Sequence, residues 1–150
     1  MVYRDQCTRQ EKTAGGDKWE YRISRYRCKP CKHTLRVLPA FLAPYKHYNV
    51  DIIMNVVDGR ITSDDPEYEM YPCEKTMFRW KEWFRQNEIF IGEYLLLCKA
   101  RLLAYGFVAL YALASTLTDL RNNTERWLSA ILRIIYDTGA VLEPYREGSG

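Results

Sequence analysis

The sequence predicts an α+β protein, with a small β-rich unit followed by an all-α helical body. Residues 19–27 alternate between two sets of side chains, which is typical of a β-strand. From residue 48 onward, apolar residues recur at helical spacing in several segments. The 150 residues, of which 27% are charged, have a globular composition that suits one domain or two small ones. The expected units are residues 1–45 and 46–150.

The β-rich unit is expected to be a small antiparallel sheet. Its expected strands are residues 2–9, 19–27 and 34–38. Alternation in the second strand places Tyr21, Ile23 and Arg25 on one face. The Gly15-Gly16 pair tolerates the positive φ of a hairpin turn, so it is expected to join the first two strands.

The helical body is expected to contain several amphipathic helices. These are residues 48–57, 73–87, one bent helix or two within 89–118, and a last helix ending at about residue 136. Asn49 is the expected N-cap of the first helix, and Asn123 or Thr124 that of the last, because short polar side chains accept hydrogen bonds from first-turn N–H groups. Gly59 and Gly139 are expected to end these two helices.

The segment Leu102–Thr118 contains 17 uncharged residues, so a membrane span is an alternative for it. Such a helix covers roughly 25 Å at 1.5 Å per residue, which falls short of the hydrocarbon core. Charged residues also bound the segment closely. We therefore expect a buried central helix here, and a membrane is not an expected partner.

The net charge of +3 conceals a strong asymmetry along the chain. Residues 1–46 carry 11 Lys and Arg against 4 Asp and Glu, a balance of +7, whereas the remaining residues carry −4. A basic head on a slightly acidic body indicates a polyanionic partner, most commonly nucleic acid. The alternative is a solvated basic surface that has no partner.

Five Cys at irregular spacing argue against a secreted disulfide framework and for a reducing, cytoplasmic location. The charged start of the chain shows no export signal. Cys28 and Cys31, two residues apart on a tight turn, are typical of one half of a zinc site. Cys7 and His33 are weaker candidate ligands, so zinc is a possible cofactor whose site is incomplete. Free thiols or a redox dithiol are the alternatives.

Residues 73–87 combine an apolar back with a polar front. Lys75, Arg79, Glu82 and Gln86 fall on one outer stripe at helical spacing. A basic helix after a short turn is typical of the recognition helix of a helix-turn-helix, whose cations contact phosphates. An ordinary surface helix is the alternative.

Two segments carry a family resemblance: residues 25–45, which run from Arg25 through the Cys28 and Cys31 turn, and residues 73–84. Together they resemble the bacterial domain-of-unknown-function proteins associated with insertion-sequence transposases. The resemblance implies an N-terminal zinc ribbon, a helix-turn-helix and a role in DNA recognition during transposition of a mobile element. The ribbon's first knuckle corresponds to about residues 1–4, where no Cys is present, so a truncated ribbon is expected.

The sequence thus predicts a cytoplasmic protein that binds double-stranded DNA and is not an enzyme. No catalytic constellation accompanies His33 or His47, and no small-molecule substrate is expected. The candidate DNA contacts are Arg22, Arg25, Arg27, Lys29, Lys32, Arg36, Lys75, Arg79, Lys81 and Arg85. Alternatives are a structural protein that forms a homo-oligomer through its apolar helices and keeps a degenerate ribbon, and a small membrane protein anchored by residues 102–118.

Overall fold

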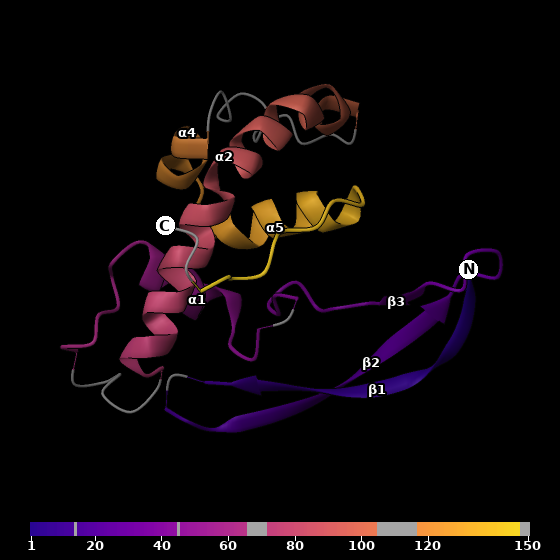
Figure 1. The fold of residues 1–150 in the computed structure, drawn as a ribbon, viewed down its shortest axis with the longest axis horizontal. Helices are drawn as coiled ribbons and strands as arrows, with labels where there is room; N and C mark the ends of the chain where they lie inside the picture. The colour runs from indigo at the N-terminus through magenta and orange to yellow at the C-terminus, as the bar shows by residue number, and fades with distance from the viewer. Residues whose placement is uncertain (14, 45, 66–71, 105–116, 148–150) are drawn as a thin grey trace.

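The computed structural model of the chain describes residues 1–13, 15–44, 46–65, 72–104 and 117–147 (Figure 1). A three-stranded antiparallel sheet precedes the helices, so the protein is α+β, as the sequence predicts. Figure 1 shows the sheet extending beneath α5, with the helices gathered toward one of its ends. The described elements are β1 (Val2–Lys12), β2 (Lys18–Arg27), β3 (Thr34–Arg36), α1 (Val50–Val57), α2 (Glu74–Ala104), α4 (Leu117–Asn123) and α5 (Trp127–Asp137).

The sheet has the strand order β1-β2-β3. The first strand is longer than predicted, because its pairing with β2 continues as far as Lys12 opposite Lys18. In the turn between them Gly16 adopts a φ of 85°, a conformation that residues with side chains rarely tolerate. The third strand ends at Arg36, two residues before the predicted end, as the chain approaches Pro39.

One face of the sheet, which we call the inner face, is turned toward the helices. The strand register places Cys7 opposite Ile23 and Arg9 opposite Tyr21. Side chains that lie directly opposite each other project to the same face. Ile23 is only 4% exposed, whereas Arg22 on the other face is exposed. The predicted alternation of residues 19–27 is therefore confirmed.

Helix α1 has the N-cap and the end that the sequence predicts, but it begins at Val50 rather than at residue 48. The side chain of Asn49 accepts a hydrogen bond from the backbone N–H of Asp51 at 2.9 Å. Gly59 follows the helix with a φ of 72°. The buried side of α1, which includes Ile53 and Val56, packs into the main hydrophobic cluster of the helical body.

Helix α2 supplies much of that cluster. Its predicted apolar side is confirmed, since Met77, Trp80, Trp83 and Phe84 are each 4% exposed. The Trp80 ring meets that of Tyr48 edge-on, with centroids 4.9 Å apart. All described members of the cluster lie between residues 43 and 142, so the sheet contributes none. The predicted division near residue 45 stays a prediction.

The predicted end of this helix near Asn87 is wrong, because α2 continues to Ala104. The buried stripe runs on through Ile91, Leu95 and Cys98 at spacings of three and four residues. The polar Asn87 falls within the same stripe and is 2% exposed. Its amide donates to the Trp83 carbonyl at 2.8 Å, so a polar residue continues the helix rather than ending it.

The predicted cap of the last helix is also wrong. Asn123 ends α4, where its amide donates to the Asp119 carbonyl, and Arg126 occupies the N-cap position of α5 without a side-chain capping bond. The predicted end holds, since α5 runs to Asp137 and Gly139 follows with a φ of 89°. The buried side of α5 includes Trp127, Ile131, Ile134 and Ile135.

Most of the predicted apolar segment Leu102–Thr118 lies outside the described residues, since these resume at Leu117 after Ala104. Within the described ranges, no helix has both the length and the apolar character that crossing a membrane requires.

Candidate nucleic-acid interface

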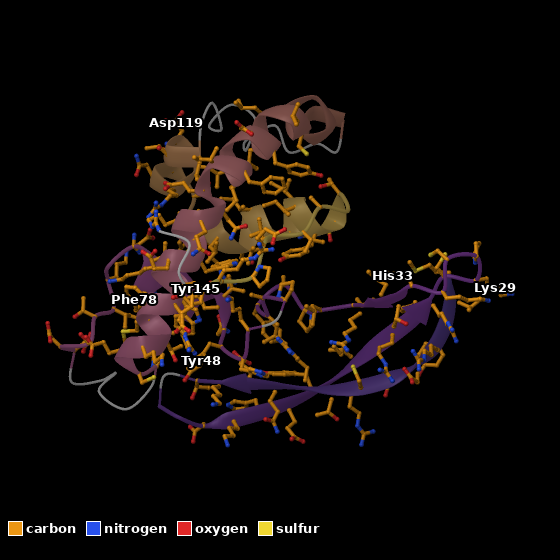
Figure 2. The ribbon with its side chains drawn as sticks, in the orientation of Figure 1. Lys29, His33, Tyr48, Phe78, Asp119 and Tyr145 are labelled. Atoms are coloured by element: carbon orange, nitrogen blue, oxygen red, sulfur yellow. The ribbon has the colours of Figure 1, made fainter. Side chains whose placement is uncertain are left out.

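The ten predicted DNA contacts do not form one surface. Figure 2 shows Lys29 and His33 at one end of the sheet and Phe78 of α2 at the other end of the molecule. Arg22 lies on the outer face of the sheet, and Arg25 and Arg36 lie opposite each other on the inner face. The structure therefore divides the candidates between the sheet and α2.

Arg25 is the most strongly paired of these cations. Its Nε donates to Asp5 Oδ1 at 2.6 Å, and its Nη2 donates to Asp5 Oδ2 at 2.5 Å. The hydrogen bond from Arg25 lowers the pKa of the Asp5 carboxyl below its usual value. The charge of Arg25 is thus offset within the sheet. Arg36, directly across from it, is exposed and has no ion pair with a described residue.

The turn between β2 and β3 holds the predicted cysteine pair. The Cys28 N–H donates to the His33 carbonyl at 2.9 Å, and the Lys32 N–H donates to the Cys28 carbonyl at 3.0 Å. Lys32 adopts a φ of 60° to close the turn. A hydrogen bond from Cys28 lowers the pKa of the Cys31 thiol, and a backbone hydrogen bond from His33 lowers it further. Arg27, Lys29 and Lys32 are all exposed around these thiols.

Cys28 and Cys31 supply two ligands of the four that a structural zinc site needs. Cys7 pairs with Ile23, which lies five residues before Cys28, or about 16 Å away at 3.3 Å per residue. His33 shares the turn, but no group of three His, Cys, Asp or Glu side chains in the described ranges is placed to hold a metal ion. The described residues do not complete a zinc site.

Helix α2 presents its predicted cations to solvent. Lys75, Arg79, Lys81 and Arg85 are all exposed, while the opposite side of the helix is buried. Arg85 is paired with Glu82 at 2.8 Å, and its hydrogen bonds lower the pKa of that carboxyl. Arg79 lies 3.8 Å from Glu147. Lys75 and Lys81 form no ion pair with a described residue, so their charges are uncompensated.

The C-terminal segment lies along the same helix. Asn87 donates to the Glu143 carbonyl at 3.1 Å and accepts from the Glu143 N–H at 2.9 Å. Gln86 likewise donates to the Arg146 carbonyl at 3.2 Å. The C-terminal segment therefore covers one end of the predicted stripe, at Gln86. The other end of the stripe, at Lys75, is exposed to solvent.

Comparison with known protein families matches residues 1–80 to a domain of unknown function designated DUF6431. The chain belongs to the DUF6431 family. Neither the curated proteins nor the solved structures contain a match. The DUF6431 match spans the sheet, α1 and the first turns of α2, so it includes Cys28, Cys31, Lys75 and Arg79. Lys81 and Arg85 follow directly after it.

Two further cations, Arg4 and Arg9, lie near the inner face of the DUF6431 sheet and were not among the predicted contacts. The Arg9 Nη2 donates to the Ala43 carbonyl at 3.3 Å and also to the Lys46 carbonyl. The basic composition of residues 1–46 includes these residues but does not single them out. Only the strand register, with Arg9 opposite Tyr21, identifies Arg9 as an inner-face residue.

Proposed function

We propose that this DUF6431 protein binds double-stranded DNA through the N-terminal half of α2. The observation that carries the proposal is the pair Lys75 and Lys81, exposed and without a carboxylate partner among the described residues. Such cations contribute to affinity by displacing the counterions condensed on DNA phosphates.

The buried side of α2 supports this role, because it fixes the orientation of the exposed side. The Phe84 and Trp127 rings meet edge-on at 5.2 Å, and the Lys46 ammonium lies 4.7 Å from the centre of the Trp83 ring. A helix held in this way presents its cations with little entropic cost on binding.

The finer expectation is a helix-turn-helix in which α2 enters the major groove. It is supported by the packing of α1 against α2 within one core. Residues 58–73 connect the two helices, a longer connection than the three or four residues of a simple helix-turn-helix. The link to insertion-sequence transposition rests on the family resemblance. Zinc is left out of the proposal, because the described residues supply only half of a site.

Fluorescence anisotropy with a labelled duplex, measured over a salt series, tests the proposal. We expect the Lys75→Gln/Lys81→Gln variant to bind roughly tenfold more weakly, with the slope of log K against log salt reduced by about 0.9 for each lost phosphate contact. Arg133→Gln, which removes one exposed cation on α5, serves as the control for a charge lost elsewhere on the surface. Undetectable binding at low salt, an affinity that is flat with salt, or equal losses in both variants contradict the proposal.

The proposed role in transposition is tested separately. The protein is used to select fragments from a genomic library that contains insertion-sequence ends. Enrichment of those ends supports a role in transposition, and retention without enrichment contradicts it while leaving DNA binding intact.

A second candidate function, a structural role in an oligomer, is favoured by a different part of α2. Ile89 and Leu97 are 76% and 78% exposed, and Leu96 is 55% exposed. Exposed apolar side chains at this density are typical of contact surfaces between proteins. Light scattering over a concentration series decides this point: a mass that stays at 17.8 kDa contradicts an oligomer.

A further inference from the structure

A groove separates the inner face of the sheet from the end of α5. Its volume is about 600 Å³, within the range of ordinary ligand sites. Figure 2 shows the turn that bears His33 at the outer end of the sheet, beyond the end of α5. Its lining includes Arg4, Arg9, Arg25 and Arg36 on the side of the sheet and Tyr136 and Val141 on the side of α5.

The charge of this groove is one-sided. Four arginines line it, and none of its described lining residues is acidic. Asp5, which lies just outside the lining, offsets Arg25 through two short hydrogen bonds and lies 3.7 Å from Arg4. Arg9 and Arg36 remain, and neither forms an ion pair with a described residue. The groove therefore holds at least two uncompensated positive charges.

Arg9 is held in place but not neutralised. Its guanidinium donates to the carbonyls of Ala43 and Lys46, which fix its position and leave its charge, and its buried Nε has no hydrogen-bond partner among the described residues. Burial lowers the pKa of Arg9, and the positive charge of Arg36 lowers it further. Burial likewise lowers the pKa of His47, with Arg9 adding to the effect. Like charges converge here, and a bound anion relieves their repulsion.

The remaining wall of the groove is apolar and accessible. Val141 is 61% exposed, and Leu38 and Tyr136 line the groove beside it. Cationic and apolar surfaces in one groove suit a ligand that carries both anionic groups and flat apolar rings. A single strand of nucleic acid has this character, because its bases are unpaired and available for contact. A duplex stacks its bases inside and offers the groove only phosphates.

We propose that this groove binds a single strand of nucleic acid, with its phosphates at Arg36 and near Arg9 and its bases against Tyr136 and Val141. The site is distinct from the duplex surface proposed on α2 and goes beyond it. The cations and the apolar wall lie on opposite sides of the bound strand, so its phosphates face the sheet and its bases face α5.

The test uses the full chain and a labelled oligothymidylate of about 12 nucleotides, a length within the range that single-strand sites cover. Arg36→Gln and Val141→Ser alter exposed groove residues and so spare the core. Arg22→Gln removes an exposed cation from the outer face of the same sheet and is the matched control. A duplex of equal length, unlabelled pyrophosphate and an acidic peptide are used as competitors.

We expect Arg36→Gln to weaken oligothymidylate binding roughly tenfold and to lower the salt slope by about 0.7, the value for one phosphate contact on a single strand. Val141→Ser is expected to weaken binding with no change in the salt slope, and Arg22→Gln is expected to match the wild type. Equal effects of Arg36→Gln and Arg22→Gln overturn the proposal. Displacement by pyrophosphate at the same phosphate concentration, or by the acidic peptide, also overturns it, because the groove then recognises any anion.

The outcome is separable from that of the duplex proposal. Duplex binding that depends on Lys75 and Lys81 and is unchanged by Arg36→Gln leaves that proposal standing. If single-strand binding is absent in the same protein, the groove proposal alone fails. Single-strand binding that depends on Arg36, without duplex binding, gives the reverse result.

Discussion

The amide of Asn49 donates to the carboxylate of Glu11 at 2.8 Å and so connects the start of α1 to the end of β1. The same carboxylate accepts from the Tyr21 hydroxyl at 2.8 Å. Asn49 also caps α1 through its side-chain oxygen. Glu11 is only 6% exposed, so its carboxylate is buried at the junction between the sheet and the helices and is satisfied there by these hydrogen bonds. It also fixes the sheet that forms the proposed groove.

We predict that Glu11→Ala lowers the free energy of unfolding by about 1–3 kcal/mol, because it leaves the Asn49 amide without its partner at a partly buried position. Urea denaturation followed by circular dichroism measures the change. Glu20→Ala is the matched control, since Glu20 lies on β2 and is exposed with a single hydrogen bond from Gln10. An equal effect of the two substitutions contradicts a stabilising role of the Glu11–Asn49 hydrogen bond.

The Asp5–Arg25 pair predicts how stability depends on pH. Because Arg25 holds the pKa of Asp5 below its usual 3.8, the folded state binds a proton less readily than the unfolded state. The stabilising effect is present above the unfolded pKa and is lost as pH falls through the folded pKa. We therefore expect Asp5→Asn to be less stable than the wild type near neutral pH, and the difference to shrink on acidification below about pH 4. Urea midpoints across this pH range measure it, and a constant difference contradicts the account.

Asn87 is predicted to hold the C-terminal segment on α2. Asn87→Ala removes one hydrogen bond within the helix and both bonds to Glu143, at a cost of roughly 2–3 kcal/mol. Amide hydrogen exchange provides the specific readout, since the Glu143 N–H loses its acceptor and is expected to exchange faster. Gln86→Ala is the control, because Gln86 bonds to Arg146 farther along the segment and its loss leaves the Asn87–Glu143 bonds in place. Unchanged exchange at Glu143 in Asn87→Ala excludes this role.

Local patterns in the sequence account for much of the fold. Alternation around Ile23 predicts a strand and its buried face, and Asn49 and Gly59 set the ends of α1 because caps act within a few residues. The sequence misplaces the end of α2, because Asn87 looks like a polar break until its bonds to Trp83 and Glu143 are known.

The candidate site is less predictable, because it depends on contacts between distant residues. The cations could be found from composition, but their pairing could not. The Asp5 partner of Arg25 lies 20 residues away, and the Glu147 partner of Arg79 lies near the other end of the chain. Arg9 enters the groove only through the register of β1 and β2. These relationships decide which cations remain free for a ligand.

The last prediction concerns the thiols of the β2–β3 turn. Because the hydrogen bond from Cys28 lowers the pKa of Cys31 below its usual 9.0 and Cys31 is exposed, a larger share of this thiol is the nucleophilic thiolate near neutral pH. We expect Cys31 to react with iodoacetamide faster than the buried Cys98.

Mass spectrometry of the alkylated peptides measures each rate separately. Cys28→Ala removes the donor and is expected to slow alkylation of Cys31 severalfold, whereas Cys73→Ala removes an exposed thiol on another part of the chain and leaves the Cys31 rate unchanged. Cys73 is itself expected to react, since its hydrogen bond with Thr76 lowers its pKa. A Cys31 rate that does not respond to Cys28→Ala shows that the two thiols act independently, and the turn then has no special chemistry for a metal or an electrophile.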